Sequence, residues 1–148
     1  MRDEHPNPTK MAFDLEGTLV DLEKLHQQAF EHVAEKLGLK FGPEEFHAFV
    51  GAGDAAIAKE IAMLGKLTQY ELDPGEIRKA KNKIYEDLLN AHTITPRDGV
   101  PEYLEKAKTL VGGDLVIASI TPDEMAQKII DGARLGPFFK HVLTESSI

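Results

Sequence analysis

The sequence contains no cysteine. Disulfide bonds and thiolate metal sites are therefore excluded. Long apolar runs are also absent, because none approaches the roughly 20 residues that a membrane-spanning helix requires. The opening stretch, residues 1–10, is polar with two prolines and lacks the hydrophobic segment of a signal peptide. We therefore expect a cytoplasmic protein with no membrane partner.

Basic residues are scarce relative to acidic ones. The chain has 17 Lys and Arg against 25 Asp and Glu, which gives a formal net charge of −8. Contacts to nucleic-acid phosphates need clustered Lys and Arg, so we expect no nucleic-acid partner. A small phosphorylated molecule is compatible with this charge, since a few local cations and a metal ion can hold it.

The remaining composition is that of an ordinary globular protein, with 42% hydrophobic and 28% charged residues. A chain of 148 residues is long enough to bury roughly two-thirds of the surface that its unfolded form exposes. The length favours one compact domain with a small insertion.

Three short apolar segments predict strands. Residues 11–13 run directly into Asp14, residues 115–118 form a continuous apolar run, and residues 141–144 could form a third strand. A continuous run is typical of a strand covered on both faces, so we expect this of residues 115–118. Because helical patterns separate the segments, the sequence predicts an α/β fold with a partial doubly wound, Rossmann-like parallel sheet.

The long stretch after the first strand has only helical patterns. Apolar residues recur every three or four positions over residues 22–37, and Gly38 follows where a left-handed C-cap belongs. Short amphipathic segments cover residues 43–50 and 54–64, and Asp73-Pro74-Gly75-Glu76 predicts a capped helix start. We therefore expect an all-helical insertion.

Two further helices flank the second strand. Residues 101–110 are amphipathic and end before Gly112-Gly113. After the strand, Thr121-Pro122-Asp123-Glu124 predicts a capping box in which Thr121 is the N-cap.

Polar residues suited to chemistry follow two of the strands. The first strand leads into the stretch from Asp14 to Asp21, and the second leads into Ser119 and Thr121. In open α/β sheets, ligands bind at the carboxyl ends of the strands. We therefore place the candidate site where these two segments meet.

The stretch from Phe13 to Asp21 resembles the first signature of the haloacid dehalogenase superfamily, an Asp-x-Asp-Gly-Thr-Leu-x-Asp pattern after a hydrophobic strand. Ser119, which closes the next strand, resembles the second signature. The helical insertion resembles the cap of the β-phosphoglucomutase-like branch, in which His26 and the Lys81-Asn82-x-x-Tyr85 pattern also recur. The resemblance implies an incomplete core of residues 1–21 and 94–148 and a helical cap of residues 22–93.

The resemblance also implies a function and roles for the loop residues. Asp14 is then the phosphoryl-accepting nucleophile, Glu16 stands at the general acid and base position, and Mg²⁺ is bound by Asp14 and the backbone carbonyl of Glu16. The implied activity is that of a Mg²⁺-dependent phosphatase or sugar phosphomutase. It acts on a small phosphorylated metabolite through an aspartyl-phosphate.

Further residues are expected to hold the substrate. Gly17, Thr18 and Ser119 are implied to lie around the phosphate, and Lys81 and His26 are candidates for substrate contact from the cap. Lys81 could instead be a solvated charge on a helix, and His26 could be a packed helix residue.

The chain departs from the family pattern in two ways. Glu16 stands where most of the phosphatases carry Asp, and a displacement of about 1 Å at such a group can lower the rate on the order of a hundredfold. The Lys and the acidic residues expected after the third and fourth strands are not present before the last residue, Ile148. We therefore expect a shortened member of the family and a poor catalyst by itself. The alternative is a catalytically silent module that binds a ligand or a partner.

Overall fold

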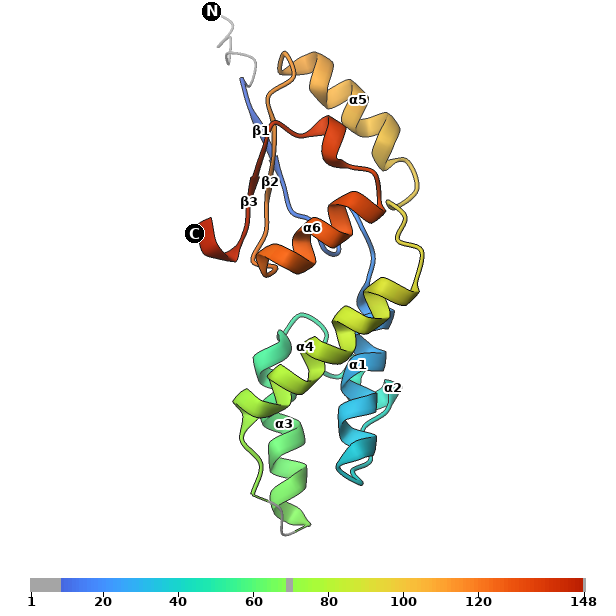
Figure 1. The fold of residues 1–148 in the computed structure, drawn as a ribbon, viewed down its shortest axis with the longest axis vertical. Coiled ribbons are helices and arrows are strands. Elements are labelled where there is room, and N and C mark those ends of the chain that lie inside the picture. Colours follow the sequence, from blue (N-terminus) through green and yellow to red (C-terminus); the bar gives the residue numbers. More distant parts are fainter. Residues whose placement is uncertain (1–8, 69–70, 148) are drawn as a thin grey trace, which may run out of the picture. The chain divides into compact units, whose positions relative to one another are not determined.

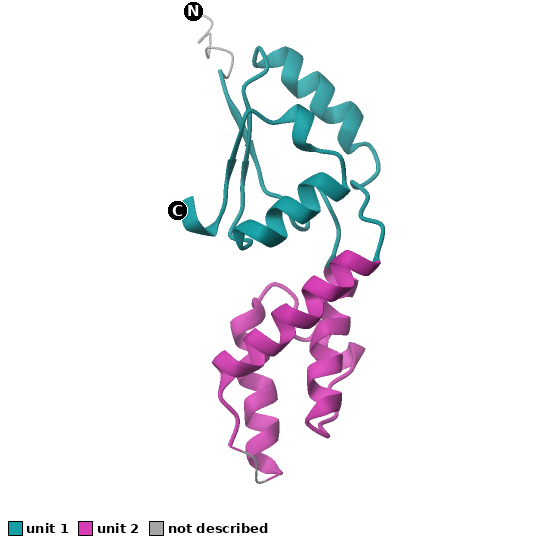
Figure 2. Cartoon of the chain, viewed as in Figure 1, with its two compact units in different colours: residues 1–22, 92–148 teal, residues 23–91 magenta. Residues whose placement is uncertain are grey.

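The computed structural model describes residues 9–68 and 71–147. Residues 1–8, on which the expectation about a signal peptide depends, lie outside this description. The chain divides into two compact units, one made of the segments up to Leu22 and from His92 onward, the other of Glu23–Ala91 (Figure 2). Among the described residues, no helix combines the length and the apolar character that crossing a bilayer requires.

The first unit contains a three-stranded parallel sheet. Its strands are β1 (Met11–Phe13), β2 (Leu115–Ala118) and β3 (His141–Leu143), in the spatial order β1-β2-β3. Phe13 is paired with Ile117, and Ile117 is paired in turn with Val142. The three predicted strands and the α/β fold with a parallel sheet are thus confirmed, with β3 ending one residue earlier than expected.

Helices α5 (Val100–Leu110) and α6 (Asp123–Gly132) lie on the same side of this sheet (Figure 1). The Phe13 ring makes edge-to-face contacts with Tyr103 of α5 at 6.1 Å and with Phe139 at 6.0 Å between ring centroids. Phe139 directly follows the short 3₁₀ helix η1 (Gly136–Phe138). These aromatic contacts fix the covered face of the sheet.

The prediction that β2 is covered on both faces is wrong. Leu115 and Ile117 are fully buried, whereas Val116 and Ala118, which alternate with them, are only half-buried. Side chains along a strand point alternately to the two faces, so only one face of β2 is enclosed. The apolar run had no alternation to reveal this difference, because all four residues are hydrophobic.

The second unit consists of α1 (Glu23–Lys36), α2 (Pro43–His47), α3 (Asp54–Leu67) and α4 (Pro74–Ala91). Helix α4 packs against both α1 and α3. The helices of this unit enclose an apolar core that includes Phe30, Phe46 and Ile61. The all-helical insertion after the first strand is thereby confirmed.

Two predicted helix ends in this unit are also confirmed. Gly38 adopts a left-handed φ of 68° after α1, and the Leu39 amide donates to the carbonyl of Ala34 at 2.9 Å. At the start of α4, the Asp73 carboxylate accepts the Gly75 amide at 3.0 Å.

Candidate active site

The segment after β1 folds into a closed turn. Gly17 has a φ of 81°, which favours glycine, and its amide donates to the carbonyl of Val20 at 2.7 Å. The amides of Leu19 and Val20 both donate to the carbonyl of Leu15, at 2.9 and 3.1 Å. The side chains of these three apolar residues are buried. They anchor the turn, while Gly17 and Thr18 are exposed.

Asp14 is the exposed residue at the start of this turn. Its Oδ1 accepts the amide of Leu15 at 2.8 Å. Because Phe13 pairs with Ile117 in parallel register, Asp14 follows β1 at the level where β2 ends. Gly17 and Thr18 are exposed in the same turn. The sheet therefore brings the turn to the predicted position at the carboxyl ends of the strands.

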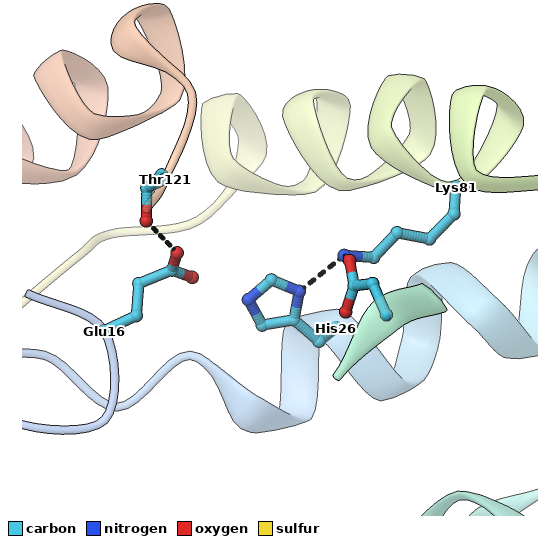
Figure 3. Close-up of polar contacts among 5 residues, drawn as sticks. Glu16, His26, Lys81 and Thr121 are labelled. Carbon is cyan, nitrogen blue, oxygen red and sulfur yellow. Dashed lines mark hydrogen bonds and ion pairs between the residues drawn. The ribbon is translucent and has the colours of Figure 1, made fainter. Parts of the chain in front are cut away.

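A chain of hydrogen bonds connects the ends of β1 and β2. The Ser119 hydroxyl donates to Thr121 Oγ1 at 2.8 Å. The Thr121 hydroxyl donates in turn to Glu16 Oε2, as Figure 3 shows. The Thr121 amide donates back to Ser119 Oγ at 3.1 Å. Ser119 and Thr121 are only 4% and 5% exposed, whereas Glu16 is half-buried. Glu16 is thereby held beside the end of β2.

The prediction that Thr121 caps α6 is wrong. The N-cap position is Pro122, and no side-chain cap bond is formed there. The Thr121 hydroxyl instead donates to the carboxylate of Glu16, and hydrogen bonds to a charged acceptor are stronger than those to neutral groups. The sequence pattern did not predict this role of Thr121. The available signal was a second hydroxyl two residues after Ser119, at the same strand end.

The residues predicted in the helical insertion form a separate cluster within the second unit. The Lys81 ammonium lies 2.5 Å from Asp54 Oδ2 and 2.7 Å from His26 Nδ1 (Figure 3). It also lies over the rings of Phe30 and Tyr85, at 5.0 and 4.7 Å from their centroids. Since the Lys81 side chain is only 1% exposed, the alternative of a solvated charge is wrong.

His26 is packed into this cluster. Its ring stacks on Tyr85 with 4.0 Å between the centroids. A lysine ammonium only donates hydrogen bonds, so Nδ1 of His26 acts as the acceptor toward Lys81. The structure therefore brings Lys81 and His26 together with Asp54, while contact of either residue with a substrate stays a prediction. No sequence signal pointed to Asp54, which lies 27 positions before Lys81.

The Asp123 carboxylate accepts hydrogen bonds from two hydroxyls that follow β3. Asp123, in the first turn of α6, accepts the Ser146 hydroxyl at 2.5 Å and also the hydroxyl of Thr144. The hydrogen bond from Ser146 has the largest effect and that from Thr144 the next largest. Together they lower the pKa of the Asp123 carboxyl below its usual value of 3.8. The start of α6 is thereby tied to the segment after β3.

The lowered pKa predicts a pH-dependent contribution of Asp123 to stability. A carboxyl group whose folded-state pKa is depressed stabilises the fold above its unfolded pKa, and this contribution is lost as the pH falls through the folded value. We expect Asp123→Asn to lower the urea midpoint at pH 7 and to have a smaller effect at pH 3. An effect that grows toward pH 3 would contradict the assignment.

The donor set after β1 is compatible with a hard cation. Mg²⁺ prefers oxygen ligands and is commonly bound by one or two carboxylates together with waters and substrate phosphate. The exposed carboxylate of Asp14 and the nearby backbone carbonyl of Glu16 are ligands of this kind. Within residues 9–68 and 71–147, no group of three or more His, Asp or Glu side chains gathers as a preformed metal site. The two oxygen donors of Asp14 and Glu16 fit a hard cation whose other ligands are water and substrate phosphate.

Comparisons with known proteins identify the family of the chain. The sequence pattern of the family described as haloacid dehalogenase-like hydrolase matches residues 11–148. Protein CbbY of Rhodobacter capsulatus is 28% identical over 115 residues, which are 75% of this chain and 50% of that protein. Fructose-1-phosphate phosphatase YqaB of Escherichia coli K12 is 29% identical over 79 residues, or 53% of this chain and 40% of that protein. The chain thus spans about half the length of these curated relatives or less.

Solved structures share the fold. CbbY of Rhodobacter sphaeroides in complex with xylulose-(1,5)bisphosphate has a TM-score of 0.71 and 20% identity, covering 95% of this chain and 64% of that one. A predicted phosphoglycolate phosphatase of Haemophilus somnus has a TM-score of 0.76 and 20% identity, covering 97% and 65%. At these identities the likeness establishes the architecture alone.

Proposed function

Because the chain belongs to the family of haloacid dehalogenase-like hydrolases, we propose that it carries the nucleophile of a Mg²⁺-dependent phosphohydrolase. The observation that carries this proposal is the exposed Asp14 on a closed turn at the carboxyl end of β1. In the same turn, Glu16 accepts a hydrogen bond from Thr121, which follows the end of β2. A nucleophile, a second carboxylate and two hydroxyls are thus contributed by neighbouring strand ends.

In the proposed reaction, a carboxylate oxygen of Asp14 attacks the phosphorus of a phosphate monoester. The bond from phosphorus to the ester oxygen breaks, and Glu16 in its protonated form gives its proton to the leaving oxygen. Water then attacks the aspartyl-phosphate and gives a proton to the Glu16 carboxylate. Inorganic phosphate leaves and Asp14 is restored. A sugar hydroxyl in place of water would make the same chain a phosphomutase.

Charge compensation is needed because a carboxylate must approach an anionic phosphate. Asp14 and the backbone carbonyl of Glu16 would hold Mg²⁺, which supplies part of this compensation when bound. Thr121 orients the Glu16 carboxylate through its hydroxyl. Ser119 is a candidate donor to the phosphate, for which its hydroxyl would have to turn away from Thr121. Gly17 and Thr18 would line the phosphate in the same turn.

The substrate we propose is a small phosphorylated sugar or a related metabolite. Support comes from the relatives, one described as a fructose-1-phosphate phosphatase and one crystallised with a sugar bisphosphate. We propose that the helical unit, Glu23–Ala91, is the substrate-selecting cap, with Lys81 and His26 as its polar contributors. Within that unit, Asp54 offsets the charge of Lys81.

A silent binding module is the second candidate. The observation that favours it is the Glu16 side chain, which is engaged by Thr121 and is one methylene longer than the aspartate of the family pattern. Such a module would bind a sugar phosphate without turning it over.

The test is phosphate release by the full chain from p-nitrophenyl phosphate and a panel of sugar phosphates, with Mg²⁺ or with EDTA. We expect slow release that requires Mg²⁺. Calorimetric titration with the same sugar phosphates runs in parallel. Binding without any release would support the silent module and contradict the hydrolase. Release that is unaffected by EDTA would contradict the role of the metal.

A further inference from the structure

Arg97 contacts the nucleophile turn, defined as residues 14–20, from a distant part of the sequence. Its guanidinium Nη1 donates to the carbonyl of Gly17 at 2.7 Å, a contact across 80 positions of the chain. Its backbone amide donates to the carbonyl of Leu19 at 2.8 Å. All of these groups lie in the first unit. One residue therefore satisfies two carbonyls of the turn.

The two carbonyls that Arg97 contacts differ from those that accept hydrogen bonds within the turn. Inside the turn, the carbonyls of Leu15 and Val20 accept the amides of Val20 and Gly17, respectively. The carbonyls of Gly17 and Leu19 accept from Arg97. The internal bonds close the turn, and the Arg97 bonds hold it from a distant segment.

The peptide between Gly17 and Thr18 follows a residue that has no side chain to restrict its backbone. Gly17 has a φ of 81° and no atom within 4 Å of the position that a Cβ would occupy. A glycine in open space can exchange between backbone conformations at low cost. Because the peptide group is planar, a donor that fixes its carbonyl also fixes the direction of the Thr18 amide. The charged guanidinium of Arg97 is such a donor.

We propose that Arg97 is a positioning residue of the nucleophile turn. It holds the Gly17–Thr18 peptide in one orientation and thereby keeps Asp14 and Glu16 in the geometry that phosphoryl transfer requires. The catalytic part of this proposal rests on the proposed function, whereas the ordering of the turn does not. A misplacement of about 1 Å in such a site lowers rates on the order of a hundredfold.

Open polar space beside Arg97 makes the proposal testable by chemical rescue. Asp21 and Asp98 line the same pocket as Arg97, with a volume of about 370 Å³. Removing the Arg97 side chain would leave this space to solvent and flank it with two carboxylates. A free guanidinium ion could enter there and donate to the carbonyl of Gly17.

The first experiment is amide hydrogen exchange on the full chain, comparing wild type with Arg97→Met. We expect exchange of the peptide covering residues 14–21 to rise about tenfold, because a local hydrogen-bonded turn opens more often without the Arg97 donor. Arg78→Met, an exposed change in the helical unit, is the matched control and should leave this peptide unchanged. Unchanged exchange in Arg97→Met would overturn the proposal.

The second experiment is turnover of p-nitrophenyl phosphate by Arg97→Ala. We expect kcat to fall by 10- to 100-fold, on the order of the loss that misplacement causes, with little change in KM. Millimolar guanidinium should restore a large part of kcat, and tetramethylammonium should not. A loss of kcat that guanidinium does not restore would show that Arg97 only supports the fold, and it would overturn the positioning role. An inactive wild type would contradict the proposed function alone, since exchange still tests the turn.

Discussion

Replacing Asp14 by Asn is expected to lower Mg²⁺-dependent phosphate release by about a thousandfold or more. Losing a covalent nucleophile removes the reaction path itself and not only an interaction along it. A carboxamide has nearly the same shape as the carboxylate but does not attack phosphorus at a useful rate. The measurement is initial-rate turnover of the best sugar phosphate, at equal protein concentration and saturating Mg²⁺.

The fold should tolerate this change. Asp14 is exposed, and its hydrogen bond from the Leu15 amide can be kept by the Asn carbonyl oxygen. We therefore expect thermal unfolding to be within experimental error of wild type. Asp87→Asn, an exposed change on α4, is the control for the loss of one negative charge and should retain full activity. A variant at Asp14 that keeps its turnover would contradict the assignment of the nucleophile.

Replacing Asp54 by Ala is expected to destabilise the helical unit by about 3 kcal/mol, because it leaves a buried cation without its counter-ion. The cation is Lys81, whose side chain is 1% exposed and lies 2.5 Å from Asp54. His26 continues to accept from Lys81 but cannot supply the negative charge. Urea unfolding followed by circular dichroism measures the loss.

A double-mutant cycle separates this effect from the loss of an acidic residue at the start of α3. Lys81→Met keeps most of the buried volume, and Asp54, which is 33% exposed, can then be hydrated. We expect Lys81→Met to cost less than Asp54→Ala. The double variant should be more stable than Asp54→Ala alone. Equal losses in the two single variants, adding up in the double one, would show that the pair is not coupled.

The elements of the fold could be predicted because their signals are local. Residues 115–118 are apolar without interruption, and β2 occupies that range. Gly38 marked the end of α1, and Asp73 with Pro74 marked the start of α4. Each of these signals acts through the conformation or hydrogen bonds of neighbouring residues, which one sequence displays directly.

The partners of polar side chains could not be predicted, because they depend on contacts between distant segments. Thr121 has the local signature of an N-cap, yet its hydroxyl donates to Glu16, which lies 105 positions earlier. Lys81 occupies a helix with many exposed charges, and its burial follows from the Asp54 and His26 side chains of two other helices. Nothing in the spacing of these residues specifies which helices meet.

For the predicted site residues, proximity and chemical role have to be distinguished. Asp14 and Glu16 follow β1, and Ser119 follows β2, so sheet pairing alone brings them to one edge. Their proximity was predictable once the strands were. Their chemistry remains a prediction that the variants above test.

The sheet register has a consequence for the order in which the protein folds. Met11 pairs with Leu115, so β1 and β2 join residues from opposite parts of the chain. The helices of Glu23–Ala91 contact one another within a single continuous segment. Local contacts form early, and pairing across long separations costs more loop-closure entropy and comes later. During synthesis, the helical unit can therefore be complete while β1 and the nucleophile turn still await the strand beside which they become ordered.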